Sequence, residues 1–358
     1  MKERASNMEL LRVVSMLLII FGHYFVCGIG FKSPDFATMG QKSVCFWFSG
    51  NVGVHLFVLI SGYFMVNLPF SLKRLAKLAC VVSFYSLTLF LAVEYGIRGN
   101  NHVSLSDCIH FLFPIMYTKY WFISTYVQLM LLSPFINYLF HAAGARRSLC
   151  LVGICALCCV YFRVESHPLR LFIFLYSLAA YIRLYASCIY KIPAKIYLTG
   201  FVLMYALAAG TLYGIHLAKH QFHCPYLYRF AQLFILSPYS LPVIFMSLVG
   251  FLGFLRLQMP ANKFINTMAS TTLAAYLIHA HPAVNSVLWK LLGAPEMLSS
   301  PYLYLHCLGC VLGIFCTCAV IELLRNAIMQ KALNYLIDKL VSPLERLLGA
   351  WVTRCSRY

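Results

Sequence analysis

Two ionisable side chains share one face of the first apolar segment, "ELLRVVSMLLIIFGHYFV", which covers Glu9–Val26. Arg12 and His23 are 11 residues apart, so on a helix they differ by about 20° around the axis and by roughly 16 Å along it. Glu9 and Ser15 fall about 60° to either side of Arg12 by the same geometry. The four side chains therefore form one polar stripe. Such groups inside an apolar segment usually face the interior of a bundle and serve a function.

The residue types in this stripe suit proton transfer and the binding of anions. A neutral imidazole in a dry site can act as a general base, and a guanidinium can bind phosphate or stabilise developing negative charge. Helix packing is the alternative interpretation. In that case Glu9 pairs with Arg12 one turn away, and His23 bonds to a neighbouring helix.

The composition places the chain in a membrane. Hydrophobic residues make up 61% of the 358 residues, charged residues 11%, and the mean hydropathy is +0.79. That leaves too little polar surface for a soluble globule of this length. The net charge of +18 comes from short basic clusters between apolar runs. Such clusters orient membrane spans and bind anionic lipid headgroups. We therefore expect membrane lipids as partners and no nucleic acid.

The 15 cysteines predict no metal centre. Most lie inside apolar segments, as Cys155, Cys158 and Cys159 do. Zinc sites need polar surroundings and second-shell partners, so packing as small hydrophobic side chains is the favoured interpretation.

Windows of about 20 residues predict an all-α, polytopic transmembrane helix bundle with about ten spans. The approximate segments are Leu11–Phe31, Val52–Leu68, Leu78–Ile97, Trp121–Phe140, Leu149–Phe162, Leu171–Tyr185, Ile196–His216, Ala231–Leu255, Met268–Trp289 and Tyr302–Leu324. If the N-terminus is cytoplasmic, the cytoplasmic side of the membrane carries about twice as many Lys and Arg residues as the outer side. This excess and an even number of spans predict that both termini are cytoplasmic.

The chain divides into a multi-span domain, residues 1–325, and a tail, residues 326–358. In the tail, apolar residues recur at helical spacing beside Lys331, Asp338 and Lys339, which predicts an amphipathic segment along the inner membrane surface. We expect Pro343 to interrupt it.

Four motifs in order resemble the acyltransferase 3 family of bacterial integral membrane proteins, which transfer acyl groups, most often acetyl, to cell-surface carbohydrates. They are "MELLRVVSMLLIIFGHYF", "GVHLFVLISGYFM", "KYWFISTYVQLMLLSPFI" and "STTLAAYLIHAHP", and the resemblance runs from about Met8 to Leu324. It implies about ten spans in the bacterial cytoplasmic membrane, and it implies that Arg12 and His23 are the residues on which activity depends. Glu9 matches the acid three residues before that arginine.

The basic pair that follows the second predicted span departs from the family pattern. "SLKRLAKLA" offers Arg74 and Lys77 where the family commonly has two arginines. Both are cationic, so attraction to the phosphates of coenzyme A is retained, although lysine lacks the bidentate fork of arginine. The pair is equally typical of a topology signal.

Four further residues are candidates for supporting or substrate-binding roles. Ser61 and Tyr63 match the second-span motif, although small residues there also allow close helix packing. Trp121 suits an aromatic belt at the outer interface or a face against a sugar ring. His279 matches the motif that ends in Leu-x-His, and an interhelical hydrogen bond explains it as well.

The predicted reaction transfers an acetyl or other short acyl group from acyl-CoA to a hydroxyl of a surface polysaccharide or lipid-linked glycan. Acetyl-CoA is then a donor substrate, and no permanently bound cofactor is expected. The sequence contains no Walker loop, Rossmann fingerprint or zinc-protease motif, so other chemistries lack support. A sugar transporter is the alternative, although it predicts internal repeats, which the sequence lacks. The sequence gives no indication of the oligomeric state.

The charge pattern makes a prediction about topology. The segment around Arg74 should face the cytoplasm, and Lys119 should face outside. In a background without native cysteines, impermeant thiol reagents should label Lys119→Cys from the outside and Arg74→Cys only from the inside. Labelling of Arg74→Cys from the outside would overturn the orientation.

Overall fold

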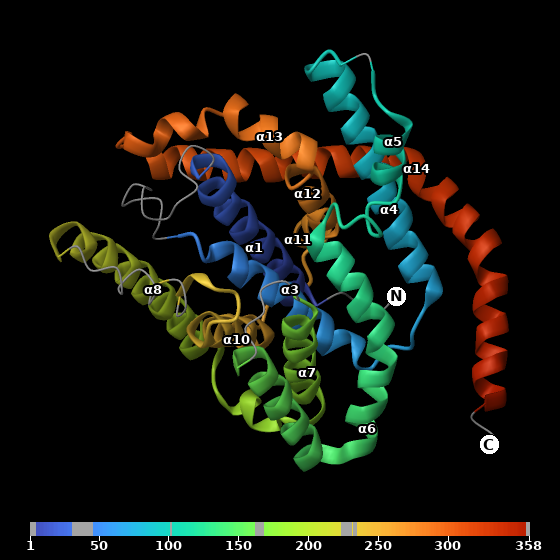
Figure 1. Cartoon of the computed structure of the whole chain (residues 1–358). Coiled ribbons are helices and arrows are strands. Elements are labelled where there is room, and N and C mark those ends of the chain that lie inside the picture. The colour runs from blue at the N-terminus through green and yellow to red at the C-terminus, as the bar shows by residue number, and fades with distance from the viewer. Residues whose placement is uncertain are drawn as a thin grey trace.

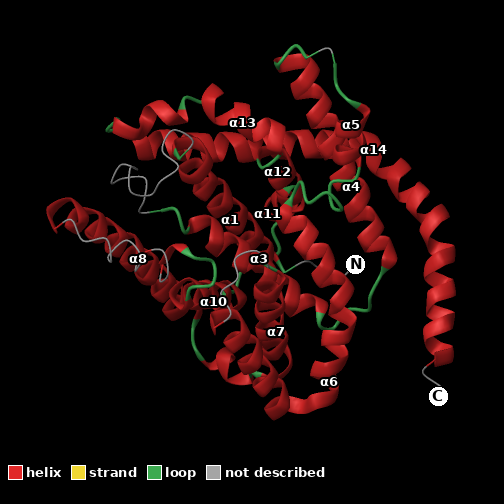
Figure 2. Ribbon diagram, in the orientation of Figure 1, coloured by secondary structure: helices red, strands yellow, loops and turns green. Residues whose placement is uncertain are grey.

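The computed structural model describes residues 5–30, 46–100, 102–161, 168–222, 231 and 235–355. Every regular element among these residues is a helix, which confirms the predicted all-α class (Figures 1 and 2). The α-helices are α1 (Ser6–His23), α3 (Ser49–Met65), α4 (Leu72–Leu91), α5 (Leu105–Leu112), α6 (Trp121–Tyr161), α7 (Leu169–Tyr185), α8 (Ala194–Phe222), α10 (Leu241–Arg256), α11 (Lys263–Ser270), α12 (Thr272–His279), α13 (Pro282–Leu291) and α14 (Leu303–Cys355).

Short helical segments of other types extend or connect these helices. The π-helix η1 (Tyr24–Ile29) continues α1, and the π-helix η2 (Ala92–Ile97) continues α4. The 3₁₀ segments η3 (Ser187–Lys191) and η5 (Ala294–Ser299) follow α7 and α13.

Within the described residues, five helical segments are long and apolar enough to cross a membrane. They are Ser6–Ile29, Leu72–Ile97, Trp121–Cys159, Ala194–Ile215 and Leu303–Leu347. The apolar helices α3 and α10 are shorter. The chain is therefore a multi-helix membrane protein, and the number of about ten spans stays a prediction.

The fourth and fifth predicted segments are separate helical stretches in the structure as well. Both lie in α6, whose two helical stretches meet at a kink at Gly144, where φ is 74° and ψ is 172°. A positive φ of this kind is accessible to glycine because it has no Cβ. The ninth predicted segment is divided into α11, α12 and α13, and one of these breaks positions the site described below.

Helix α3 lies at the centre of the bundle and packs on α1, α7 and α10. Its glycines permit the close approach. A Cβ at Gly53 would lie 2.5 Å from the carbonyl oxygen of Ser15 on α1, and one at Gly62 would lie 2.5 Å from that of Tyr176 on α7. Small residues let membrane helices approach in this way. The α1–α3 contact therefore fixes where the polar stripe of α1 points.

The last helix runs without a break from Leu303 to Cys355. The expected interruption at Pro343 is wrong, because the helix accommodates this proline in its interior. Proline removes one backbone hydrogen bond and usually bends a helix, and α14 changes direction along its course (Figure 1). Lys73 Nζ at the start of α4 forms an ion pair with Asp338 Oδ1 at 2.7 Å, so the tail contacts the bundle.

A buried ion pair on α14 is linked to α4 by a tyrosine hydroxyl. Arg325 Nε lies 2.7 Å from Glu322 Oε2, one turn away on α14, and the hydroxyl of Tyr85 on α4 donates to the same oxygen at 2.6 Å. Both charged side chains are buried. Buried charges need such complete pairing, so this contact fixes the two helices relative to each other.

The α1–α3 contact generates a stability prediction. Gly53→Ala should destabilise the folded protein by about 1–3 kcal/mol, because the added methyl group meets the backbone of α1. Gly210→Ala in α8 is the control, since a Cβ there meets no atom within 4 Å. Thermal unfolding in detergent should show a lower transition temperature for Gly53→Ala only. Equal transition temperatures would contradict the packing argument.

Candidate active site

The centre of the candidate site is a contact between two histidines from distant parts of the chain. His23 Nδ1, at the last residue of α1, lies 3.0 Å from His279 Nε2, at the last residue of α12. His279 is fully buried, whereas His23 is partly exposed. Both were predicted site residues, and the structure brings them together.

The hydrogen bonds assign the protons of the neutral pair. His279 Nδ1 lies 2.5 Å from the carbonyl oxygen of Ala275. A carbonyl only accepts, so His279 Nδ1 carries the hydrogen and Nε2 is the acceptor. His23 Nδ1 then donates to His279, which leaves His23 Nε2 with a free lone pair. The partly exposed imidazole thus has the tautomer that a general base requires.

The backbone around each histidine is specialised. Directly after His23, the α-helix becomes the π-helix η1, and π-segments of this kind are frequent at functional sites. Directly after His279, the chain leaves α12 and restarts as α13 at Pro282, a residue type favoured in the first turn of a helix. The break leaves the imidazole at a helix end.

His281 holds this break in place. Its Nδ1 accepts from the backbone N–H groups of Ala283 at 3.1 Å and Val284 at 3.4 Å. Its Nε2 donates to the carbonyl of Ser86 on α4 at 2.9 Å. The buried ring therefore caps α13 and attaches it to α4. Because His281 follows His279 by only two residues, it also limits the position of His279.

A cavity of about 370 Å³ begins beside the polar stripe of α1. Glu9 and Arg12 line it and form an ion pair at 2.8 Å. The second carboxylate oxygen of Glu9, Oε2, is buried and has no hydrogen-bond partner among the described residues. A buried acceptor in this state favours a ligand that donates a hydrogen bond.

The rest of this cavity is largely apolar and aromatic. Its walls include Phe57 from α3, Phe122 and Tyr126 from α6, and Tyr276 from α12. The rings of Phe122 and Tyr126 are stacked with centroids 6.0 Å apart. Tyr276 extends the wall to the site, because its ring centroid lies 6.2 Å from that of His279. Such a lining, with a few polar groups at one end, is typical of a small-molecule site.

Among the predicted supporting residues, Ser61 lines the cavity and donates to the carbonyl of Phe57 at 2.9 Å. Tyr63 does not, because its hydroxyl contacts Arg183 NH1 and the Tyr190 hydroxyl, both at 2.8 Å. Trp121 is 50% exposed and is absent from the cavity lining, whereas its neighbour Phe122 is part of it.

The basic pair on α4 lies close to the same cavity. Arg74 and Lys77 are both exposed, and Arg74 donates to the carbonyl of Pro69. Leu78 lines the cavity. Because residues four apart share one face of a helix, Arg74 lies one turn from the cavity wall on the same face as Leu78.

A second cavity, of about 490 Å³, borders the histidine pair on the α13–α14 side. His279, His306 and Thr317 contribute polar groups to an otherwise apolar lining. The hydroxyl of Tyr24, the residue after His23, lies 2.8 Å from His306 Nδ1. Sequence reasoning missed Tyr24 and His306. Their positions one residue after His23 and one turn into the last span were the available signals.

No group of three or more His, Cys, Asp or Glu side chains arranged to hold a metal ion occurs in the part of the chain that the structure describes.

The fold and the site together define a helical membrane protein with a partly buried histidine contact, of which His279 lines the second cavity. The family model described as an acyltransferase domain, that of the acyltransferase 3 family, matches residues 6–322. The chain therefore belongs to this family of membrane acyltransferases. No curated protein and no solved structure gives a match.

Proposed function

We propose that this protein is a membrane O-acyltransferase of the bacterial cytoplasmic membrane, which moves an acetyl or other short acyl group from acyl-CoA to a hydroxyl of a cell-surface or lipid-linked polysaccharide. The observation that carries the proposal is the His23–His279 pair, in which His23 Nε2 keeps its lone pair and His279 lines the second cavity. Family membership supports the acyl-transfer class.

In the proposed reaction, His23 Nε2 takes the proton of the acceptor hydroxyl as its oxygen attacks the thioester carbonyl carbon. The carbon–sulfur bond then breaks, and the proton on His23 passes to the coenzyme A sulfur. The products are an ester and a free thiol. The hydrogen bond to His279 holds the His23 ring and stabilises its positive charge during the reaction. A general base of this kind contributes about 10² to 10⁴ in rate.

The donor occupies the cavity that begins at Glu9 and Arg12. Arg12 lies roughly 16 Å along the helix from His23, which is too far to reach the thioester carbonyl. It therefore acts on the distant part of the donor. The unpaired Glu9 Oε2 suits an amide N–H of the pantetheine arm. The aromatic walls exclude water from the thioester, which strengthens electrostatic interactions there.

Arg74 and Lys77 supply positive charge for the diphosphate and ribose phosphate of coenzyme A. They follow the loop after α3, within a turn of the cavity wall at Leu78. Exposed cations attract phosphates in a salt-dependent manner. The transporter alternative is not favoured, because the chain belongs to an acyltransferase family.

The histidine pair gives the first activity prediction. His23→Ala should lower acetyl transfer by about 10² or more, since the base is lost. His279→Ala should lower it less, and the double variant should be no worse than His23→Ala, because residues that act as a unit are not additive. The assay follows the transfer of labelled acetyl groups from acetyl-CoA to envelope glycans, and each rate is divided by the amount of the variant in the membrane. Near-normal transfer by well-expressed His23→Ala would sink the mechanism.

The basic pair, Arg74 and Lys77, gives the second activity prediction. Changing Arg74 and Lys77 together to Gln should raise the acetyl-CoA concentration required for half-maximal rate and flatten its salt dependence. Lys73→Gln is the matched control, because Lys73 lies in the same turn but pairs with Asp338. An unchanged donor requirement in the double variant would leave these residues as topology signals.

A further inference from the structure

A third cavity, of about 350 Å³, lies at the C-terminal end of α4, between η2, α5 and the start of α13. The candidate span Leu72–Ile97 separates this end of α4 from Arg74. The cavity is therefore at the membrane face opposite the one where the donor phosphates are proposed to bind. None of its lining residues borders either of the other two cavities.

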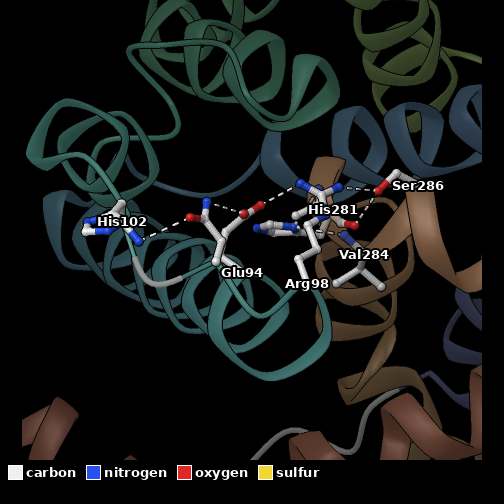
Figure 3. A network of polar contacts seen from close by, with 8 residues as sticks. Glu94, Arg98, His102, His281, Val284 and Ser286 are labelled. Carbon is white, nitrogen blue, oxygen red and sulfur yellow. Dashed lines mark hydrogen bonds and ion pairs between the residues drawn. The ribbon is translucent and has the colours of Figure 1, made fainter.

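One side of the cavity is a polar network that Figure 3 shows. Glu94 Oε1 accepts from Arg98 NH1 at 2.6 Å, and Glu94 Oε2 accepts from Asn100 Nδ2 at 3.2 Å. Arg98 NH2 also donates to the hydroxyl of Ser286 on α13 at 2.8 Å. The network fixes these side chains before any ligand binds, which reduces the entropy cost of binding.

The network retains hydrogen-bonding capacity. A carboxylate has about four acceptor sites and a guanidinium five donors. The contacts above use two acceptor sites of Glu94 and two donors of Arg98. Asp107 adds a second, exposed carboxylate to the lining, and its Oδ2 accepts from the hydroxyl of Ser104 at 2.8 Å.

The opposite side of the cavity is apolar. It consists of Phe90, Val103, Phe111, Pro282 and Ala283. The rings of Phe90 and Phe111 are stacked with centroids 4.1 Å apart, so this wall is rigid. A cavity with one hydrogen-bonding wall and one apolar wall matches a pyranose ring, which has hydroxyl groups at its rim and C–H groups on its faces. Two carboxylates and one guanidinium line the cavity, and Lys119 Nζ lies 4.6 Å from the centroid of the Phe111 ring. The charges around the cavity therefore balance, which favours a neutral ligand.

The cavity is also close to the histidine pair. Ala283 lines it, and His279 is four residues earlier in the chain. A fully extended chain spans at most about 3.6 Å per residue, so the Cα atoms of these residues are at most about 14 Å apart. A chain of a few sugar units covers that distance.

We propose that this cavity is an acceptor subsite that binds a neutral sugar unit of the glycan, a few units from the hydroxyl that is acylated. The assignment of the glycan as acceptor rests on the proposed function. Carboxylates of Glu94 and Asp107 accept from sugar hydroxyls, Arg98 donates to them, and the Phe90–Phe111 wall contacts a face of the ring.

Binding can be measured without any acyl transfer. Saturation-transfer difference NMR on the full chain in nanodiscs would use glucose, galactose, mannose and N-acetylglucosamine as probes, with sialic acid as the anionic comparison. At least one neutral sugar should give a saturable signal, which Glu94→Gln combined with Asp107→Asn should abolish. Asp338→Asn, a carboxylate variant in the tail, should retain it. No signal from any neutral sugar, or equal signals in the double variant, would overturn the proposal.

The transfer assay separates this proposal from the proposed function. At saturating acetyl-CoA, the double variant should need about tenfold more envelope glycan for half-maximal rate, because hydrogen bonds to charged groups are lost. Its acetyl-CoA requirement should be unchanged. An unchanged glycan requirement would refute the subsite. No acetyl transfer by the unaltered protein, together with specific sugar binding, would instead refute the proposed function alone.

Discussion

The site depends on one hydrogen bond between α1 and α12, from His23 to His279. Polar groups that lack partners are costly inside a membrane protein, so the two imidazoles must meet or leave the interior. Their meeting requires α1 to lie directly on α3, where glycines remove the side chains that would separate the backbones. It also requires α12 to end where it does, which His281 secures by capping α13 and bonding to α4. Much of the described bundle thus serves to hold one pair of rings at hydrogen-bonding distance.

The sequence was sufficient for the class of protein and for the residues of the first helix. Helical periodicity placed Arg12 and His23 on one face, and the motifs identified the family. The Glu9–Arg12 ion pair, which the helix-packing interpretation expected, is present because it is a contact within one helix. The sequence left the role of His279 open, since a partner 256 residues away is set by helix packing and has no local signal. Tyr63 shows the same limit, because its motif was recognised but its side chain points to Arg183.

Breaks in helices were only partly accessible to sequence reasoning. Hydropathy over a window of about 20 residues predicted separate segments on either side of residues 141–148, and the structure has a kink there at Gly144. The same window treated residues 268–289 as one span, which the structure divides into α11, α12 and α13. Proline was a poor guide, since Pro343 lies within α14 while Pro282 begins α13. The break before α13 is held by His281, whose ring accepts from backbone N–H groups of the first turn.

The distance in sequence between His23 and His279 has a consequence for synthesis. A ribosome adds about 5–20 residues per second, so His279 follows His23 by roughly 10–50 s. During that interval the first helix is already made, while its partner does not exist. The hydrogen bond that orients His23 therefore cannot form until nearly the whole chain has emerged, and truncated products carry the imidazole without this geometry.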